Sequence, residues 1–289
     1  MIKDVLAARL REYAPANALE QEHALAEIMQ HYVLASLARA GFFGHAAFHG
    51  GTCLRILHAM NRFSEDLDFV LKAPDAAFNW EPFLSRIRRD CADDGIRVDA
   101  QGRSARETAV RRVFVKTDSI GQILTLELPF ARNRPRTIRV TLEVDTNPPA
   151  GATLDTRFIT FPVTAAVTCM DLASGFGSKC HALLCRDYAK GRDWYDFIWY
   201  TSRRVTPNLE LLSRALDQQG PWAGQHITVT GRWLLNALQG RIAAIDWPAT
   251  ADDVARFVMS REQAGLAVWS SALFLQQLER LEAAFRENG

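Results

Sequence analysis

The chain has few of the features that assign a protein to a class at once. Its 289 residues include 5 cysteines, which are scattered and form no CxxC pair, so neither a disulfide framework nor a zinc ribbon is indicated. No apolar run approaches the ~20 residues of a membrane span. Arg9 and Arg11 interrupt the N-terminus where a signal peptide would be apolar. These absences favour a cytoplasmic protein with reduced thiols and no membrane partner.

An excess of charge of either sign is also lacking. The net charge is +1, so bulk electrostatics neither indicates nor excludes a nucleic-acid partner. His181 and Cys185 are four residues apart, but no further ligands accompany them to make a zinc site. No Ser-His-Asp or Cys-His arrangement for nucleophilic catalysis stands out. The functional argument therefore depends on local patterns.

The most specific pattern is a glycine turn followed by a short helix, within residues 48–71. Gly50, Gly51 and Thr52 follow a small apolar run, as in a turn that leaves a strand, and residues 53–60 have helical apolar spacing. Glycines let backbone N–H groups approach a phosphate, and a helix N-terminus favours anions. No Gly-Lys-Ser/Thr follows, so this is not a P-loop. The plain alternative is a tight turn without a ligand.

Two aspartates then open an apolar segment, Asp66–Leu71, that is typical of a buried strand. Strand side chains alternate, so Asp66 and Asp68 are predicted to project from the same face. Aspartate is disfavoured in strands, and two neighbouring carboxylates repel each other unless a cation lies between them. Their oxygens are hard ligands suited to Mg²⁺. We interpret the pair as a metal site beside a phosphate site, rather than as exposed acids on an ordinary strand.

A two-metal site generally needs a third acid, and residues 139–145 offer two candidates. Alternation in this predicted strand places Glu143 and Asp145 on one face. Either could lie opposite the aspartate pair on a neighbouring strand. Taken singly, each is more typical of a solvent-facing acid.

Residues 179–197 combine cations and acids. If the segment is one helix, Lys179, Arg186, Lys190 and Asp193 lie along one face, where the cations could hold the β- and γ-phosphates of a nucleotide. Asp193 could orient Lys179 or a ribose hydroxyl. A solvated helix face is the common alternative for such a pattern.

The remaining pattern predicts an α+β chain. Helices are expected first, then short strands of a small mixed sheet, and helices again from Val167 to the end. The predicted segments are helices at 1–41 and 80–94 and strands at 96–100, 110–115, 123–128 and 138–144. The linker-like residues 148–151 divide the chain into domains at 1–150 and 151–289. Residues 103–139 hold nine Arg or Lys against three Asp or Glu, which could bind a polyanion such as RNA or be a solvated face.

Taken in order, these motifs resemble one known family. The matching residues are Gly-Gly-Thr at 50–52, RFSEDLDF at 62–69, Leu-Glu-Val at 142–144, Lys179, Arg192-Asp193 and Asp196. This order resembles the AbiEii/MenT-type nucleotidyltransferase toxins, which belong to the DNA polymerase β-like nucleotidyltransferase superfamily. The resemblance covers about residues 20–200 and implies a polymerase β-like nucleotidyltransferase core with N-terminal helices and a helical C-terminal half.

The resemblance also implies roles for individual residues. Asp66, Asp68 and Glu143 would be the catalytic carboxylates that hold Mg²⁺, with two ions expected, and Glu143 is preferred to Asp145. Lys179 would bind the triphosphate, and Asp193 would be a further catalytic acid that follows the other three in the sequence. Both would be contributed by the second domain. The nucleotide-binding residues would be Gly50, Gly51, Thr52, Ser64, Lys179 and Arg186.

The function implied is Mg²⁺-dependent transfer of NMP from an NTP to an acceptor, by the toxin of a bacterial toxin–antitoxin system. The acceptor expected from the resemblance is the 3′ end of tRNA, and the expected protein partner is a cognate antitoxin. The alternatives are transfer to a protein hydroxyl or a small molecule, a catalytically silent nucleotide-binding module, and a metal-dependent phosphohydrolase. The sequence does not identify which NTP is used.

Overall fold

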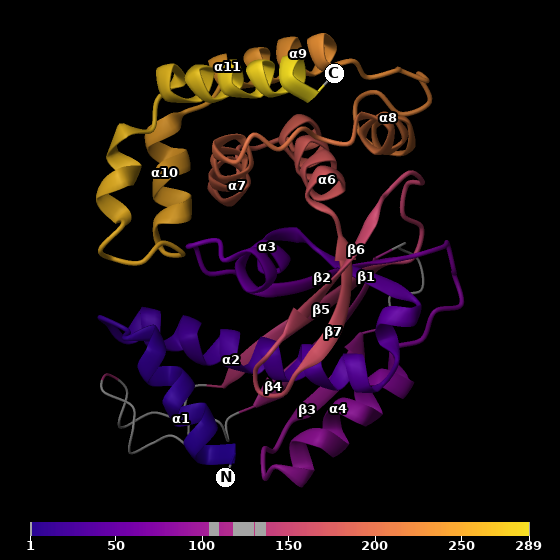
Figure 1. Cartoon of the computed structure of the whole chain (residues 1–289), viewed down its shortest axis with the longest axis vertical. Coiled ribbons are helices and arrows are strands. Elements are labelled where there is room, and N and C mark those ends of the chain that lie inside the picture. The colour runs from indigo at the N-terminus through magenta and orange to yellow at the C-terminus, as the bar shows by residue number, and fades with distance from the viewer. Residues whose placement is uncertain (1, 104–109, 118–129, 131–136, 289) are drawn as a thin grey trace. The chain divides into compact units, whose positions relative to one another are not determined.

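The computed structural model describes residues 2–103, 110–117, 130 and 137–288. The chain divides into two compact units (Figure 1). The first comprises residues 1–148 and 156–169, and the second comprises residues 149–155 and 170–289. Each unit has its own core, described below.

The elements follow the predicted order of helices, sheet, then helices. In the first unit the helices are α1 (Ile2–Tyr13), α2 (Ala18–Arg39), α3 (Gly50–His58) and α4 (Glu81–Asp93). The strands are β1 (Ala46–His49), β2 (Asp66–Leu71), β3 (Asp99–Arg103), β4 (Val110–Thr117), β5 (Ile138–Asp145), β6 (Leu154–Ile159) and β7 (Ala165–Met170). The later helices are α6 (Leu172–Cys185), α7 (Gly191–Ser202), α8 (Leu209–Gln218), α9 (Gly231–Ala243), α10 (Trp247–Ala255) and α11 (Ser271–Asn288).

The described strands form one mixed sheet in the order β3-β4-β5-β2-β1-β7-β6. β2 runs parallel to β5 and antiparallel to β1, and β4 is antiparallel to both of its neighbours. The predicted α+β class with a mixed sheet is confirmed. The strand predicted at 123–128 lies outside the described residues. The strand β6 was not predicted, and the helical region begins at Leu172 rather than at Val167.

The core of the first unit lies behind the buried face of β2 and β5. Helix α2 packs on β5 and on α4. The Phe69 ring of β2 makes an edge contact with Phe42 at 4.8 Å between centroids, and Phe42 stacks on Trp80 at 5.3 Å. Burying an aromatic side chain of this kind contributes about 1.5–3 kcal/mol. This packing fixes which face of β2 is buried, and so fixes the opposite face that carries its aspartates.

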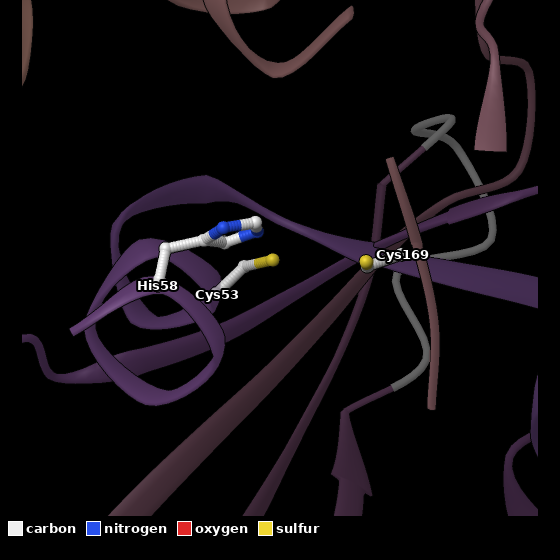
Figure 2. A group of neighbouring side chains, drawn as sticks. All are labelled: Cys53, His58 and Cys169. Atoms are coloured by element: carbon white, nitrogen blue, oxygen red, sulfur yellow. The ribbon is translucent and has the colours of Figure 1, made fainter. Parts of the chain in front are cut away.

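Helix α3 follows β1 without a loop between them. β1 pairs in parallel with β7 through Phe48 and Cys169. The side chains of Cys53 and His58 on α3 lie close to Cys169 on β7 (Figure 2). The position of α3, which begins with the glycine pair, is therefore tied to two strands of the sheet.

The second unit is built on aromatic packing between its helices. Trp247 of α10 stacks on Phe274 of α11 at 3.8 Å, and Trp194 of α7 makes edge contacts with both rings. Helix α6 packs against α7, α8 and α9. Among the described helices, none is both long and apolar enough to cross a membrane.

Candidate active site

The two aspartates of β2 project from the sheet face opposite the core, as predicted. Leu67, between the two aspartates, and Phe69, after the second, are 0% and 1% exposed. Asp66 and Asp68 themselves are half-buried. The alternation that buries the apolar residues therefore leaves both carboxylates accessible on one face. That face is where a cation could bind.

Strand register places Glu143 directly beside Asp68. In the parallel pairing of β2 with β5, Asp68 is the partner of Glu143 and Asp66 is the partner of Thr141. Asp145 is instead the partner of Val70, two residues farther from Asp66. Burial raises the pKa of the Asp145 carboxyl, which accepts a hydrogen bond from the backbone N–H of Asn147. Of the two candidate third acids, Glu143 is thus the one in register with the aspartate pair.

Arg112 adds a cation to this row of side chains. It is the antiparallel partner of Glu143 in β4, and its Nε lies 2.5 Å from Glu143 Oε1. The hydrogen bond and charge of Glu143 raise the pKa of Arg112, with further contributions from Asp66 and Asp68. Four cross-strand neighbours on β1, β2, β5 and β4 therefore form a row across the sheet: His49, Asp68, Glu143 and Arg112. Sequence reasoning missed Arg112; the available signal was its place in the basic segment 103–139.

The donor set fits a hard divalent cation. Three carboxylates on one face of two adjacent strands repel one another, and Arg112 is paired with one of them, Glu143. The Glu143 side chain is 23% exposed, so its oxygens are accessible. Carboxylate oxygens of this kind suit Mg²⁺, which usually takes one or two protein carboxylates and completes its shell with water and substrate phosphate.

The glycine pair is required by close approaches in this region. Gly50 has φ +77°, and a Cβ there would lie 2.6 Å from Asp68 Oδ2. A Cβ on Gly51 would overlap the guanidinium of Arg62 and lie 3.1 Å from Ser64 Oγ. The turn can therefore lie against Asp68, Arg62 and Ser64 only with glycine at both positions. The backbone at the start of α3 is thereby brought beside the aspartates.

Thr52 has a structural contact of its own. Its side chain is fully buried, and its hydroxyl donates a hydrogen bond to the backbone carbonyl of Asp66. This bond ties the first turn of α3 to the first residue of β2. Thr52 therefore aligns the glycine turn with the aspartate strand.

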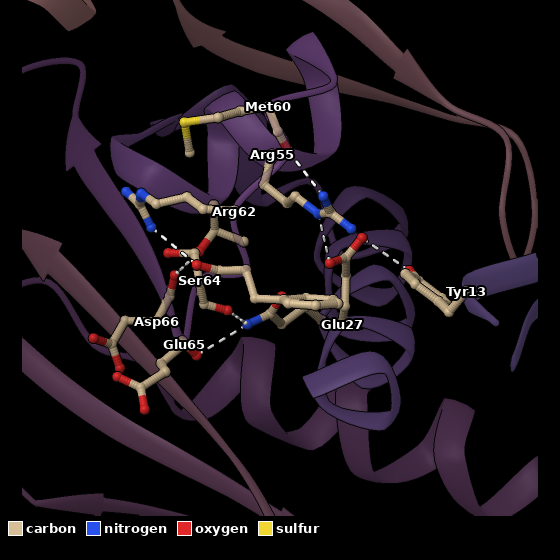
Figure 3. Close-up of polar contacts among 11 residues, drawn as sticks. Tyr13, Glu27, Arg55, Met60, Arg62, Ser64, Glu65 and Asp66 are labelled. Carbon is tan, nitrogen blue, oxygen red and sulfur yellow. Dashed lines mark hydrogen bonds and ion pairs between the residues drawn. The ribbon is translucent and has the colours of Figure 1, made fainter. Parts of the chain in front are cut away.

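Helix α2 supports the loop that precedes β2 (Figure 3). Gln30 donates from Nε2 to the carbonyls of Ser64 and Glu65 at 2.8 and 3.0 Å. Glu27 accepts from Arg55 Nε at 2.8 Å and from the Tyr13 hydroxyl at 2.8 Å. Arg55 and Glu27 are both largely buried, so this ion pair fixes the far end of α3 against α2. The loop that carries Ser64 is therefore held by hydrogen bonds from the Gln30 side chain to its backbone carbonyls.

The second unit holds a separate group of charged residues. Lys179 Nζ lies 2.6 Å from Asp193 Oδ1 and 2.8 Å from Asp196 Oδ2. Arg186 Nε lies 2.9 Å from the other oxygen of Asp193. Asp193 and Asp196 are 4% and 0% exposed. Burial acts to raise the pKa of Asp193, but the charges of Lys179 and Arg186 outweigh it and hold that pKa below its usual range.

The single helix considered for residues 179–197 is wrong. Helix α6 ends at Cys185, Arg186 has extended backbone with ψ 139°, and α7 begins at Gly191. A Cβ on Gly191 would collide with the backbone of α10, so the start of α7 is fixed by packing. Lys179 and Asp193 meet because two helices pack together, and not because they share one helix face. Asp196 lies in the middle of α7.

The predicted site residues thus form two groups. The first unit brings together Gly50, Gly51, Ser64, Asp66, Asp68 and Glu143, with the Thr52 hydroxyl held by the Asp66 backbone. The second unit brings together Lys179, Arg186 and Asp193, and adds Asp196.

One protein-family model matches most of the chain. A family model described as "Nucleotidyl transferase AbiEii toxin, Type IV TA system" matches residues 32–285. Comparison with curated proteins gives no significant match.

Several solved structures are similar at low sequence identity. JHP933 from Helicobacter pylori has TM-score 0.53 and 17% identity, covering 93% of this chain and 96% of its own. A structure of a proposed nucleotidyltransferase from H. pylori has TM-score 0.52 and 16% identity, with the same coverage. The nucleotidyltransferase toxin MenT4 from Mycobacterium tuberculosis has TM-score 0.49 and 17% identity, covering 96% and 98%. The two H. pylori structures share the fold of this chain.

Proposed function

The chain belongs to the AbiEii nucleotidyltransferase toxin family, and from this premise we propose that it transfers NMP from an NTP to the 3′ end of a tRNA. Nucleotidyl transfer, with an NTP as substrate and a divalent metal, is the activity of the family. The identity of the metal as Mg²⁺, the presence of two ions and the tRNA acceptor are our proposals.

The row of carboxylates beside the glycine turn is the observation that carries the proposal. Asp66, Asp68 and Glu143 would hold the metal, which when bound neutralises charge on the α-phosphate and the leaving pyrophosphate. Gly50 lies against Asp68, and we propose that the backbone N–H groups of Gly50 and Gly51 bind the same phosphates. The turn and the acids together suit a triphosphate.

The reaction assigned to this site is an in-line displacement at the α-phosphorus. A bond forms from the acceptor hydroxyl oxygen to phosphorus, while the bond to the bridging oxygen breaks and pyrophosphate leaves. We assign Glu143 to accept the hydroxyl proton, since it lies beside Asp68 and remains accessible. The contribution of the protein is mainly positioning and charge stabilisation.

We propose Lys179 and Arg186 of the second unit as nucleotide-binding residues. Asp193 bridges both cations, and Asp196 supports Lys179 from a fully buried position. A lysine held in one orientation by two buried carboxylates is pre-organised, although part of its charge is already neutralised. Asp193 and Asp196 therefore act as positioning residues for the phosphate-binding cations.

An RNA acceptor is supported by the basic segment 103–139, of which β4 is described. Arg111 and Arg112 lie on this strand, and Arg112 is beside the carboxylates. Cations next to the acids would place a phosphate backbone near the reacting hydroxyl. A cognate antitoxin is the protein partner we expect, because the family is that of type IV toxin–antitoxin systems.

The test is labelling of total RNA by the purified chain with each of four α-labelled NTPs. We expect label at the 3′ end of tRNA with wild type and none with Asp68→Asn. Label in protein or in a small-molecule fraction instead would show that the acceptor is not tRNA, although the reaction is still nucleotidyl transfer. Release of phosphate or NMP without a labelled acceptor would indicate a phosphohydrolase. Nucleotide binding without turnover under any of these conditions would indicate a silent module.

A further inference from the structure

A second set of ligand-type side chains lies apart from the carboxylates. Cys53 and His58 come from α3 and Cys169 comes from β7, and one ligand atom of each lies within 4.8 Å of the others. Figure 2 shows the Cys53 sulfur and the His58 ring projecting from the helix to the side on which Cys169 lies. Cys53 and Cys169 are 116 positions apart along the sequence, which is why no spacing motif reveals the set.

Two strands and one helix bring the set together. Cys169 is next to β1 through its pairing with Phe48, and β1 leads directly into α3. Helix α3 places Cys53 in its first turn and His58 at its last residue, where Ala59 ends the helix in a left-handed conformation at φ 55°. The set is thus fixed by the same turn that places Gly50 and Gly51.

The two sulfurs are buried and in contact. Cys53 and Cys169 are 4% and 0% exposed, and neither is in a disulfide. Hydrogen bonding to Cys169, together with burial, raises the pKa of the Cys53 thiol well above its usual range. His58 is half-buried as a residue, and its Nε2 atom is screened from solvent like the two sulfurs.

The donor chemistry differs from that of the carboxylate row. Two sulfurs and one imidazole nitrogen select a borderline-soft cation such as Zn²⁺, whereas carboxylates suit Mg²⁺. With Zn–S near 2.3 Å and Zn–N near 2.0 Å, ligand atoms in a tetrahedral site lie roughly 3.5–3.8 Å apart. The observed limit of 4.8 Å means that a side-chain closure of about 1 Å completes the geometry. Three protein ligands leave the fourth position to water.

We propose that Cys53, His58 and Cys169 form a Zn²⁺ site that joins α3 to β7. The bound ion replaces a thiol–thiol contact with metal–ligand bonds between the helix and the strand. It therefore holds the first turn of α3, and with it the Gly50–Gly51 turn, against the sheet. The proposal does not depend on nucleotidyl transfer, because metal binding is measured without nucleotide.

Cobalt is the probe, because Co²⁺ occupies zinc sites and reports thiolate ligands by its absorption. The full chain is titrated with Co²⁺ in the presence of a non-thiol reductant. We expect a thiolate-to-cobalt charge-transfer band and visible bands typical of tetrahedral Co²⁺, saturating at one ion per chain. Addition of Zn²⁺ should abolish both bands, and Zn²⁺ alone should raise the midpoint of thermal unfolding.

Single-residue variants test whether the bound Co²⁺ is held by Cys53 and His58. Cys53→Ser should remove most of the charge-transfer band, and His58→Gln should weaken Co²⁺ binding at least tenfold. The matched control is Cys91→Ser, a fully buried cysteine of the first unit outside the set, which should behave as wild type. Cys53→Ser alters a buried side chain and could prevent folding. In that case the test depends on His58→Gln, because His58 is only half-buried. Absence of a charge-transfer band in wild type, or an unchanged titration in His58→Gln, would overturn the proposal.

Discussion

Arg112 Nε lies 2.5 Å from Glu143 Oε1, and the two residues are cross-strand partners in β4 and β5. The guanidinium therefore neutralises the carboxylate that the proposed function assigns to the metal. A cation entering the site must compete with Arg112 for Glu143. Arg112 is 55% exposed, so its side chain can leave the carboxylate without crossing a packed core.

Arg112→Gln should increase the affinity of the site for Mn²⁺, used as a spectroscopic stand-in for Mg²⁺. An exposed ion pair contributes up to ~1 kcal/mol, so the gain should reach at most about fivefold. Mn²⁺ titration followed by electron paramagnetic resonance measures it. Arg111→Gln is the matched control, because it removes the same charge from the adjacent position of β4. Weaker Mn²⁺ binding by Arg112→Gln than by the control would show that Arg112 assists the metal instead of competing with it.

The register of β5 leads to a second prediction, on the identity of the third acid. Glu143→Gln should reduce NMP incorporation at least about a thousandfold, because losing a metal ligand removes several kcal/mol of charge stabilisation. Asp145→Asn should stay within about tenfold of wild type, since Asp145 is paired with Val70 and not with Asp68. Incorporation at saturating NTP, with circular dichroism as a check on folding, measures both. An equal loss in the two variants would remove the distinction drawn from register.

Gly50→Ala should reduce both stability and transfer. The added Cβ would lie 2.6 Å from Asp68 Oδ2 at a φ of +77°, so the variant must strain the backbone or displace the carboxylate. Backbone strain of this kind costs about 1–2 kcal/mol. Gly44→Ala is the matched control in the same unit, because a Cβ there meets nothing within 4 Å. Urea unfolding and NMP incorporation are the measurements, and wild-type activity in Gly50→Ala would contradict the close approach.

Periodicity of two made the shared face of the aspartate pair predictable from the sequence. Asp66 and Asp68 had to share a face because Leu67 and Phe69 had to be buried, and a one-residue slip would expose the whole apolar set. The same rule could not choose between Glu143 and Asp145, which share a face and differ only in their partners on β2. Strand pairing made that choice, and it depends on the order of the sheet, which no local pattern contains.

The charged group of the second unit depends on contacts that the sequence does not encode locally. Lys179 and Asp193 have helical spacing, which favoured a single helix, but the chain breaks at Arg186 and returns as α7. Packing of α7 against α10 through Gly191 decides where the new helix begins. Asp196 lies buried against Lys179, and the sequence pattern gave no sign of this contact, because an acid buried in mid-helix has no signature without its partner.

The ion pairs of Lys179 lead to the last prediction, which concerns stability. Lys179→Met should destabilise the second unit by about 3–5 kcal/mol, because Asp193 and Asp196 are left buried without their principal cation. Arg214→Met is the matched control: it removes an exposed pair with Glu210 one helical turn away, worth about 0.3–0.5 kcal/mol. Urea unfolding followed by tryptophan fluorescence is suitable, since 6 of the 7 tryptophans lie in the second unit.

The loss of stability in Lys179→Met is expected to depend on pH, because the pKa of Asp193 is lowered in the folded protein. The lowered pKa of Asp193 means that its stabilising effect is fully present above the unfolded value of about 3.9 and is lost as the pH falls through the folded value. In Lys179→Met the pKa of Asp193 rises, so the variant lacks this contribution at neutral pH, whereas in strong acid neither the variant nor the wild type has it. The difference in free energy of unfolding between wild type and variant should therefore shrink as the pH is lowered below about 4. A difference that stays constant from neutral pH into acid would mean that Lys179 stabilises the unit by packing of its stem and not by its charge.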